Sequence, residues 1–373
     1  MKKSAIFITL LGICLSITCG SDETYTLKIE DGVNIIRNKA PLWGDEPKIE
    51  LELVQKIGDL EHVDENYLLF NPFDIAKDAK GNLYVLDMGN YRVQVYDAGG
   101  KYITTMGRQG NGPGELAVPM SINIDNEGNI VVADWGNNRI QKFSPDGKDL
   151  GSNKTSMPFQ LLRFLSTGEM VTQSVSMNPN VEVNSLISIS DNGGNVVREF
   201  GEIDKSKSGD LTLREIYNAI MYDVDSEDNI ITVYLYRNRI DKYTRDGTLL
   251  FRTERKLNFP VPDRPDMKKV TTPDGQTVEV PQPVMVSFGV QTDGNSRIWA
   301  ATFREQPDYE NIDPNNPIMQ PLFDFHIFDK EGVLLAVLQI DKKFTNFRIF
   351  GDRLYAVDTA GTMSVYEYKI VEK

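Results

Sequence analysis

Cysteine is scarce in this sequence, and its placement argues against disulfide bonds in the main body of the chain. The 373 residues contain two cysteines, Cys14 and Cys19, both close to the N-terminus. A disulfide framework needs cysteines spread through the folded part of a chain. The fold must therefore rest on a hydrophobic core, for which a hydrophobic content of 40% is ordinary.

An excess of positive charge is also lacking. Lysine and arginine number 40 against 54 aspartate and glutamate residues, so the formal net charge is -14. Nucleic-acid binders neutralise phosphates with a basic face, and attachment to anionic lipid through charge has the same requirement. The composition argues against DNA or RNA as partners, and against membrane binding through charge alone.

Histidine is equally rare, which limits the metal and catalytic chemistry of the chain. Neither His62 nor His326 has a histidine or cysteine at ligand spacing, so an ordinary zinc site is not expected. No Gly-x-Ser-x-Gly motif stands out, and the glycine-rich segment 107–114 lacks the Lys-Ser/Thr of a phosphate loop. We expect no catalytic residue, no metal and no cofactor. Calcium held by Asp and Asn oxygens is the alternative, although these residue types also form turns.

Long hydrophobic runs are absent, but a short one marks the N-terminus. Two lysines precede the apolar residues 5–18, a pattern typical of a signal peptide and too short for a comfortable transmembrane helix. Cys19 then resembles the lipid-accepting cysteine of bacterial lipoproteins, although Thr18 stands where Gly or Ala is common. We expect an exported, lipid-anchored protein of the cell envelope, with a soluble periplasmic or secreted protein as the alternative. The predicted division is a signal peptide over 1–18, a tether over 19–45 and a folded body over 46–373.

One short pattern recurs six times along the body. Each copy is rich in β-branched and aromatic residues, and most begin at a Gly, Asn or Asp turn. The copies are Gly81–Asp87, Gly128–Asp134, Gly168–Ser174, Asp228–Tyr234, Ser296–Thr302 and Asp352–Asp358. Most are apolar at every position, as in strands that are covered on both faces.

The segments around each copy complete a four-strand unit. One strand precedes the copy and two follow it, whereas helical periodicity is confined to a brief candidate over 211–219. Four antiparallel strands repeated six times predict an all-β fold, a six-bladed β-propeller. The last unit ends after its third strand, so we expect the N-terminal segment 49–57 to supply the missing outer strand and close the ring.

The second unit carries a more specific signature. Gly107-Arg-Gln-Gly-Asn-Gly-Pro-Gly-Glu-Leu116 is followed by Pro119, by Gly128-Asn129 and by the stretch Val132–Ile140. This run closely resembles the NHL-repeat consensus. The first unit matches well and the fourth in part, whereas the third, fifth and sixth depart from it. The resemblance implies a propeller that acts mostly as a binding platform, with some relatives being enzymes that hold a metal in the central channel.

An Asp-x-Gly-Asn-x-Arg motif links the second and third strands of the first two units. Asp87 and Arg92 end one such loop, and Asp134 and Arg139 end the other. Residues at the two ends of a hairpin loop are cross-strand neighbours, so each pair is expected to form a local ion pair worth about 0.2–1 kcal/mol. The motif is thus predicted to be structural.

The fourth unit breaks this motif. Tyr234 replaces the aspartate, and Arg239 follows Arg237. This indicates unpaired positive charge on one side of the ring. Strand alternation places these loops on one face together with two long insertions, about 254–283 and 304–321, the first holding a hairpin around Pro-Asp-Gly. Long loops on a rigid scaffold are frequent sites of function.

We therefore expect a monomeric binding platform that meets a small molecule, a glycan or a protein on this face. The alternatives are a calcium-dependent hydrolase, lactonase or lyase acting in the central channel, and a purely structural surface protein. The expected ligand-binding residues are Trp135, Tyr236, Arg237, Arg239, Arg304 and Tyr309.

Overall fold

The computed structural model describes residues 24–59, 64–155, 160–174, 183–205, 211–271, 275–306, 322–359 and 361–373. The predicted lipidation site Cys19, His62 and Tyr309 lie outside these residues, as does the predicted signal peptide. Among the residues described, none of the helices has the length and apolar character needed to traverse a bilayer.

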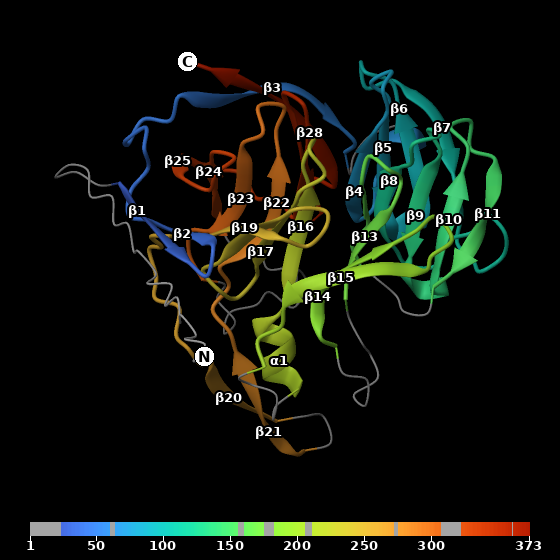
Figure 1. Ribbon diagram of the computed structural model, residues 1–373. Helices are drawn as coiled ribbons and strands as arrows, with labels where there is room; N and C mark the ends of the chain where they lie inside the picture. Colours follow the sequence, from blue (N-terminus) through green and yellow to red (C-terminus); the bar gives the residue numbers. More distant parts are fainter. Residues whose placement is uncertain are drawn as a thin grey trace, which may run out of the picture.

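Six blades, each with four antiparallel strands, form the body as predicted, and two further strands extend the sheet of blade four (Figure 1). Within blades one to five the four strands run in sequence order from the inner strand outward, whereas the outer strand of blade six is the N-terminal β3. Blades one to three comprise β4 (Pro72–Lys77), β5 (Leu83–Asp87), β6 (Arg92–Tyr96) and β7 (Tyr102–Met106); β8 (Pro119–Ile124), β9 (Ile130–Asp134), β10 (Arg139–Phe143) and β11 (Asp149–Lys154); and β12 (Arg163–Phe164), β13 (Met170–Gln173), β14 (Ser185–Ser190) and β15 (Val196–Glu202). Blades four to six comprise β16 (Ile220–Val224), β17 (Ile230–Tyr234), β18 (Ile240–Tyr243) and β19 (Leu249–Arg255); β22 (Ser287–Thr292), β23 (Ile298–Phe303), β24 (Phe323–Phe328) and β25 (Leu334–Gln339); and β26 (Asn346–Phe350), β27 (Arg353–Asp358), β28 (Ser364–Glu372) and β3 (Ile49–Ile57).

The core lies between neighbouring blades. Every residue of β5, β9 and β17 is buried, as the apolar runs predicted. Leu86 and Val93 of blade one pack in one cluster with Ile122 and Val132 of blade two. Burial of apolar side chains on both faces of each sheet is the main favourable contribution to such a fold.

The ring is closed by the N-terminal strand, as predicted. β3 pairs antiparallel with β28, from Ile49 opposite Glu372 to Ile57 opposite Val365. Ile49 and Ile57 are both buried. Blade six therefore takes three strands from the end of the chain and one from its beginning.

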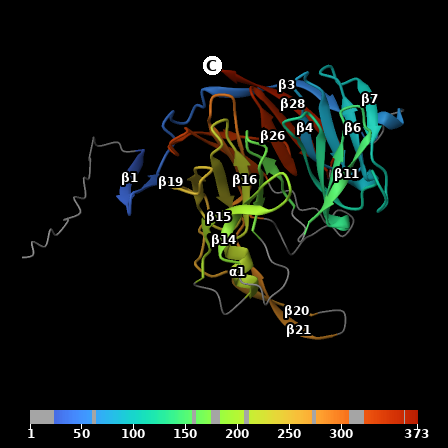
Figure 2. The same ribbon diagram turned by 45° about the vertical axis from the view of Figure 1, so that its right-hand side comes forward.

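The predicted tether over 19–45 is only partly supported, because residues 25–38 form a hairpin that belongs to the fold. β1 (Tyr25–Glu30) and β2 (Val33–Asn38) extend blade four, with β2 running parallel to β19. Figure 2 shows β1 on the outer side of β19. Farther along, the amides of Leu42 and Trp43 donate to the carbonyls of Leu334 and Leu335 in blade five, at 2.8 and 2.9 Å. Together with β3, the N-terminal segment joins the outer edges of blades four, five and six.

Two inserted elements project from one face, which we call the insertion face. The helix α1 (Leu211–Tyr217) confirms the brief helical prediction, and the hairpin of β20 (Asp266–Thr271) and β21 (Thr277–Gln282) confirms the one predicted in the first insertion. Both lie at the bottom of Figure 1. The opposite face, which we call the turn face, carries the tight turns between the inner strands and the second strands.

Candidate functional site

The Asp-x-Gly-Asn-x-Arg motifs form buried clamps. Arg139 Nε lies 3.2 Å from Asp134 Oδ2, and the two residues are direct cross-strand partners. Asp134 also accepts from the amide of Ala117 at 2.9 Å, and Arg139 donates to the carbonyl of Gly112 at 3.0 Å, so the pair holds the glycine-rich loop that enters blade two. Arg92 and Asp87 form the same pair at 2.8 Å. The structural interpretation of the motif is confirmed.

The ion-pair energy of about 0.2–1 kcal/mol expected from the sequence is too low for Asp134 and Arg139, because this pair is buried. The side chains of Arg139 and Asp134 are 9% and 0% exposed. Removing one partner of a buried pair leaves an uncompensated charge and costs about 3–5 kcal/mol. Gly136 of this motif is also required by space, since a Cβ there would approach the Ala117 Cβ to 2.8 Å.

The prediction of unpaired positive charge in blade four is wrong. Arg239 Nε donates to both carboxylate oxygens of Asp241, at 2.9 and 3.1 Å, and its guanidinium lies over the ring of Tyr234 at 4.7 Å. The missing carboxylate is supplied two residues later in the chain. A side chain two positions along a strand points to the same face, which brings Asp241 beside Arg239.

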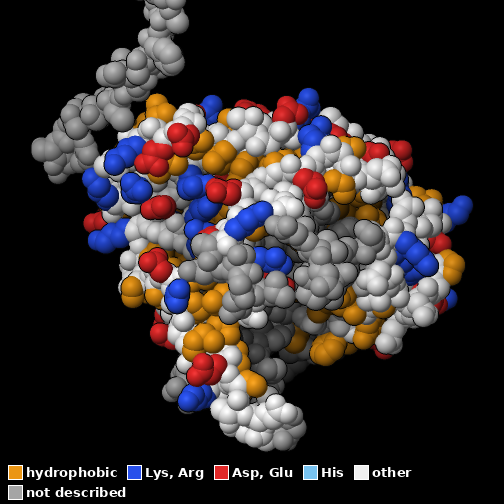
Figure 3. Space-filling model, turned by 60° about the horizontal axis from the view of Figure 1, so that its bottom comes forward, with side chains coloured by type: hydrophobic (Ala, Val, Ile, Leu, Met, Phe, Trp, Pro, Cys, Tyr) orange, Lys and Arg blue, Asp and Glu red, His pale blue; other side chains and the backbone are white. Residues whose placement is uncertain are grey.

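The other expected ligand-binding residues are dispersed or already paired. Arg237 lies 3.1 Å from Asp204, and Arg304 Nη2 lies 2.6 Å from Asp324. Tyr236 shares a loop of blade four with Arg237 and Arg239, whereas Trp135 lies in blade two. On the insertion face, basic and acidic side chains are interspersed with hydrophobic ones (Figure 3).

The inner strands carry a different set of polar residues, which the sequence analysis did not single out. Each of the six blade junctions is bridged by a side chain from an inner strand or its flank. In order around the ring, the bonds are Ser121 Oγ to Asp74 (3.0 Å), Asn123 Nδ2 to the Leu162 carbonyl, Arg163 Nε to Asp223 (3.3 Å), the Thr292 amide to Asp223 (3.0 Å), the Ile349 amide to Gln291 (3.3 Å) and Arg348 Nη1 to Asp74 (3.3 Å).

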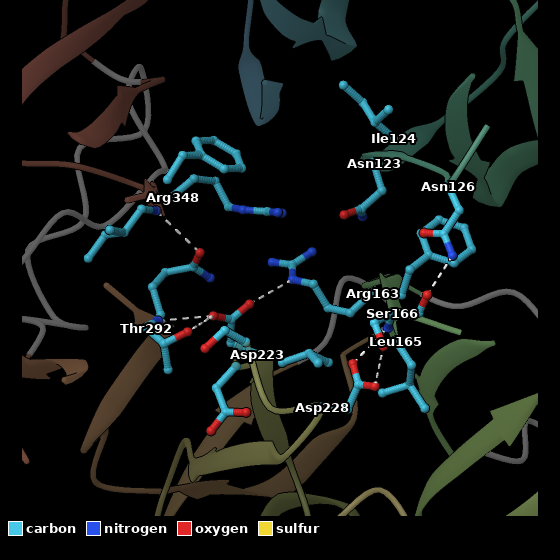
Figure 4. A pocket seen from close by; sticks show the side chains of 17 residues that line it. Asn123, Ile124, Asn126, Arg163, Leu165, Ser166, Asp223, Asp228, Thr292 and Arg348 are labelled. Carbon is cyan, nitrogen blue, oxygen red and sulfur yellow. Dashed lines mark hydrogen bonds and ion pairs between the residues drawn. The ribbon is translucent and has the colours of Figure 1, made fainter. Parts of the chain in front are cut away.

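A cavity of about 350 Å³ lies inside this ring of bonds. Its lining comes from blades two to six, at the carboxyl ends of the inner strands and in the turns that follow them. It therefore lies toward the turn face, opposite the face on which the sequence placed the site. The polar residues that its wall takes from the inner strands are Asn123, Arg163, Asp223, Gln291, Thr292 and Arg348, most of them labelled in Figure 4.

Two guanidinium groups dominate the interior of the cavity. Arg163 and Arg348 point toward one another from blades three and six (Figure 4). Their side chains are each 6% exposed. Burial, and next the neighbouring Arg163 guanidinium, lower the pKa of Arg348 to about 10. The Nε of Arg348 is buried without a hydrogen-bond partner among the residues that the structure describes.

A signal for these residues was present in the sequence. Arg163 lies in the run Leu-Leu-Arg-Phe-Leu, and Arg348 lies in Phe-Arg-Ile-Phe. A single charge inside an apolar strand must find a partner or a polar space. Applied to the inner strands, that rule would have indicated the channel rather than the loops.

The donor set of the described residues does not form an evident metal centre. No group of three or more His, Cys, Asp and Glu side chains is placed to hold a metal ion within the part of the chain that the structure covers. Asp74 and Asp223, the carboxylates nearest the arginines, are each engaged by an arginine and by the next blade.

Comparison with solved structures gives the same fold. A protein of Bacteroides fragilis named a candidate exported protein aligns with a TM-score of 0.61 at 14% identity, over 91% of this chain and 99% of the other. A member of the DUF4221 family from Bacteroides vulgatus aligns with 0.57 at 10% identity, over 87% and 99%. A gluconolactonase of Xanthomonas campestris aligns with 0.50 at 12% identity, over 86% and 99%.

Sequence comparison identifies the family. None of the curated proteins is similar in sequence to this chain. The family model DUF5128, described as a 6-bladed beta-propeller, matches residues 58–284, which is more than half of the chain. The finer resemblance to NHL repeats stays a prediction. The chain belongs to the six-bladed β-propeller family DUF5128.

Proposed function

We propose that this protein is an exported binding protein that takes a small molecule into the cavity near the turn face of its channel. The observation that supports this proposal is the cavity itself, whose wall combines donors and acceptors from five blades. Pockets of a few hundred cubic ångström with convergent polar groups are the usual form of small-molecule sites. The rigid, bonded ring keeps these groups in place before a ligand arrives.

The proposed location is the cell envelope, with a lipid on Cys19 as the anchor. The basis is the N-terminal sequence pattern, joined to a body without cysteine after that position. Replacement of Cys19 by serine should move the protein from the membrane fraction to the soluble fraction and abolish labelling by a fatty-acid probe. Labelling that persists in Cys19→Ser would contradict the anchor without touching the cavity.

The alternative of calcium-dependent hydrolysis or elimination in the channel has no specific observation in its favour. The gluconolactonase resembles this chain at 12% identity, a level that supports the fold alone. The channel carboxylates are paired with arginines rather than grouped with one another. Binding without chemical change is therefore the function we propose.

Blocking the mouth of the cavity tests this proposal. Ser226 lies in an exposed turn and lines the cavity, whereas its exposed neighbour Glu227 does not line it. A panel of sugars, organic acids and amines would be screened by thermal shift against the wild type. Any compound that binds in the channel should lose its effect in Ser226→Trp and keep it in Glu227→Trp. Equal binding by both variants would place the site elsewhere.

A further inference from the structure

We propose that the cavity is an oxyanion site, in which a carboxylate or phosphate group of the ligand lies between Arg163 and Arg348. This inference rests on the proposed binding function and adds the chemical class of the ligand. It starts from the hydrogen-bond capacity of the two guanidinium groups. A guanidinium carries five N–H donors in a planar fork and no acceptor.

Most of these donors are not used by the described residues. Arg348 donates through Nη1 to Asp74 at 3.3 Å, and its Nε has no partner within the described part of the chain. Arg163 donates through Nε to Asp223 at 3.3 Å and through Nη1 to the Leu162 carbonyl at 2.8 Å. The Nη2 atoms of both arginines have no hydrogen bond to any residue that the structure describes. Of these atoms Arg348 Nε is buried, and the other unused N–H groups belong to side chains that line the cavity. A buried donor without a partner is costly, so an acceptor between the two arginines is favoured.

The charges of the wall leave the arginines as the groups available to a ligand. Asp223 is bound to the wall by Arg163 and by the amide and hydroxyl of Thr292. Asp228, near the rim, accepts from the amide and hydroxyl of Ser166 at 2.7 and 2.6 Å. Asp225 pairs with Lys242 at 2.9 Å. The carboxylates thus have partners in the wall, while the two like-charged guanidinium groups face each other.

A bound oxyanion would stabilise this arrangement of charges and donors. It neutralises the repulsion between the arginines and accepts from the N–H groups that lack partners. Arginine binds carboxylate and phosphate through paired, charge-assisted hydrogen bonds. Asn123 and Gln291, which also line the cavity, can contact the uncharged part of the ligand. A neutral sugar could accept some of these hydrogen bonds, but it would place no negative charge between the two guanidinium groups.

The test uses the full chain at low ionic strength, with succinate and inorganic phosphate as probes and glucose as the neutral comparator. Binding would be measured by isothermal titration calorimetry, because anions also stabilise proteins nonspecifically. We expect the anions to bind at millimolar concentration or below and glucose not to bind. If only phosphate or only succinate binds, that result assigns the oxyanion group.

The matched variant replaces one ion pair by a neutral pair. The double variant Arg348→Gln, Asp74→Asn has the same net charge as the wild type. Its two new amide side chains can hydrogen-bond to each other, so the variant is expected to stay folded. Anion affinity should fall roughly tenfold or more in this variant. Arg163→Lys keeps a charge but loses the fork, and should weaken binding as well.

The outcomes separate the two proposals. Glucose or another neutral compound that binds in Glu227→Trp but not in Ser226→Trp, with no anion binding, would overturn the oxyanion inference and leave the cavity function standing. Anion binding unchanged in the Arg348→Gln, Asp74→Asn variant would also overturn it. If no probe or panel compound is sensitive to Ser226→Trp, both proposals fail.

Discussion

At the scale of single residues, the buried polar groups differ in where their partners come from. Asp134 and Arg139 are five positions apart in one hairpin, so their pairing could be predicted from spacing. Arg239 and Asp241 are also close in sequence, but the motif predicts the carboxylate at the position of Tyr234. Arg163 and Asp223 come from different blades, 60 residues apart. Contacts of that kind depend on the closed ring, so spacing in the sequence could not pair these two residues.

His326 lies within β24 and is 8% exposed. Burial, and next the nearby Arg255 cation, lower its pKa well below the ordinary value of 6.5. Below pH 6.5 the unfolded chain therefore takes up a proton that the folded protein does not bind. The free energy of unfolding should fall by up to about 1.4 kcal/mol per pH unit from this residue.

This pH dependence can be isolated by difference. Urea unfolding of the wild type and of His326→Gln would be compared at pH 7.5 and pH 5.5. The wild type should lose more stability than the variant between the two values, since carboxylate titration is common to both. Parallel losses would mean that His326 is protonated in the folded state.

At the scale of elements, the repeats predicted almost every strand of the ring, including β3. The hairpin of β1 and β2 escaped prediction because its attachment is not local. β2 pairs in parallel with β19, which follows it by more than two hundred residues, and no turn in the sequence joins them. The hairpin is also little buried, since Ile35, Ile36 and Asn38 are the only buried residues of the two strands. The segment consequently resembled a polar tether.

Asn38, at the end of β2, should anchor this hairpin. Its buried amide donates to Thr253 Oγ1 at 2.8 Å and to the Gly332 carbonyl at 3.2 Å, and accepts from the Leu334 amide at 2.8 Å. Asn38→Ala should lower the free energy of unfolding by about 1–3 kcal/mol, because it leaves buried groups without partners. The matched control is Asn34→Ala, an exposed residue of the same strand, which should change stability by less than about 0.5 kcal/mol. Equal effects in urea unfolding would show that the hairpin is not fixed at Asn38.

At the scale of the whole molecule, the ring depends on one strand from the N-terminus. Without β3, the third strand of blade six would present an open edge and expose Tyr368 and Ile370, which are now buried. Open apolar edges promote association between chains. The closure by β3 that the sequence predicted therefore covers an edge at which chains could associate.

Truncation tests the role of β3. A chain that begins at Lys48 keeps β3 and should stay monomeric with a cooperative unfolding transition. A chain that begins at Gly58 should aggregate or unfold at a lower urea concentration, as measured by size-exclusion chromatography and fluorescence. A synthetic peptide of residues 46–58 should restore the longer chain's behaviour. A monomeric, equally stable chain from Gly58 would contradict the role of β3.

Ring closure also determines when the molecule can finish folding. Ser364 donates to the carbonyl of Gly58, which is 306 residues earlier in the chain. Contacts of such sequence separation form slowly, because loop-closure entropy opposes them until the rest of the structure is in place. β3 can therefore pair only after β28 has emerged during synthesis or transport. Until then β3 is an unpaired strand that needs protection from other chains.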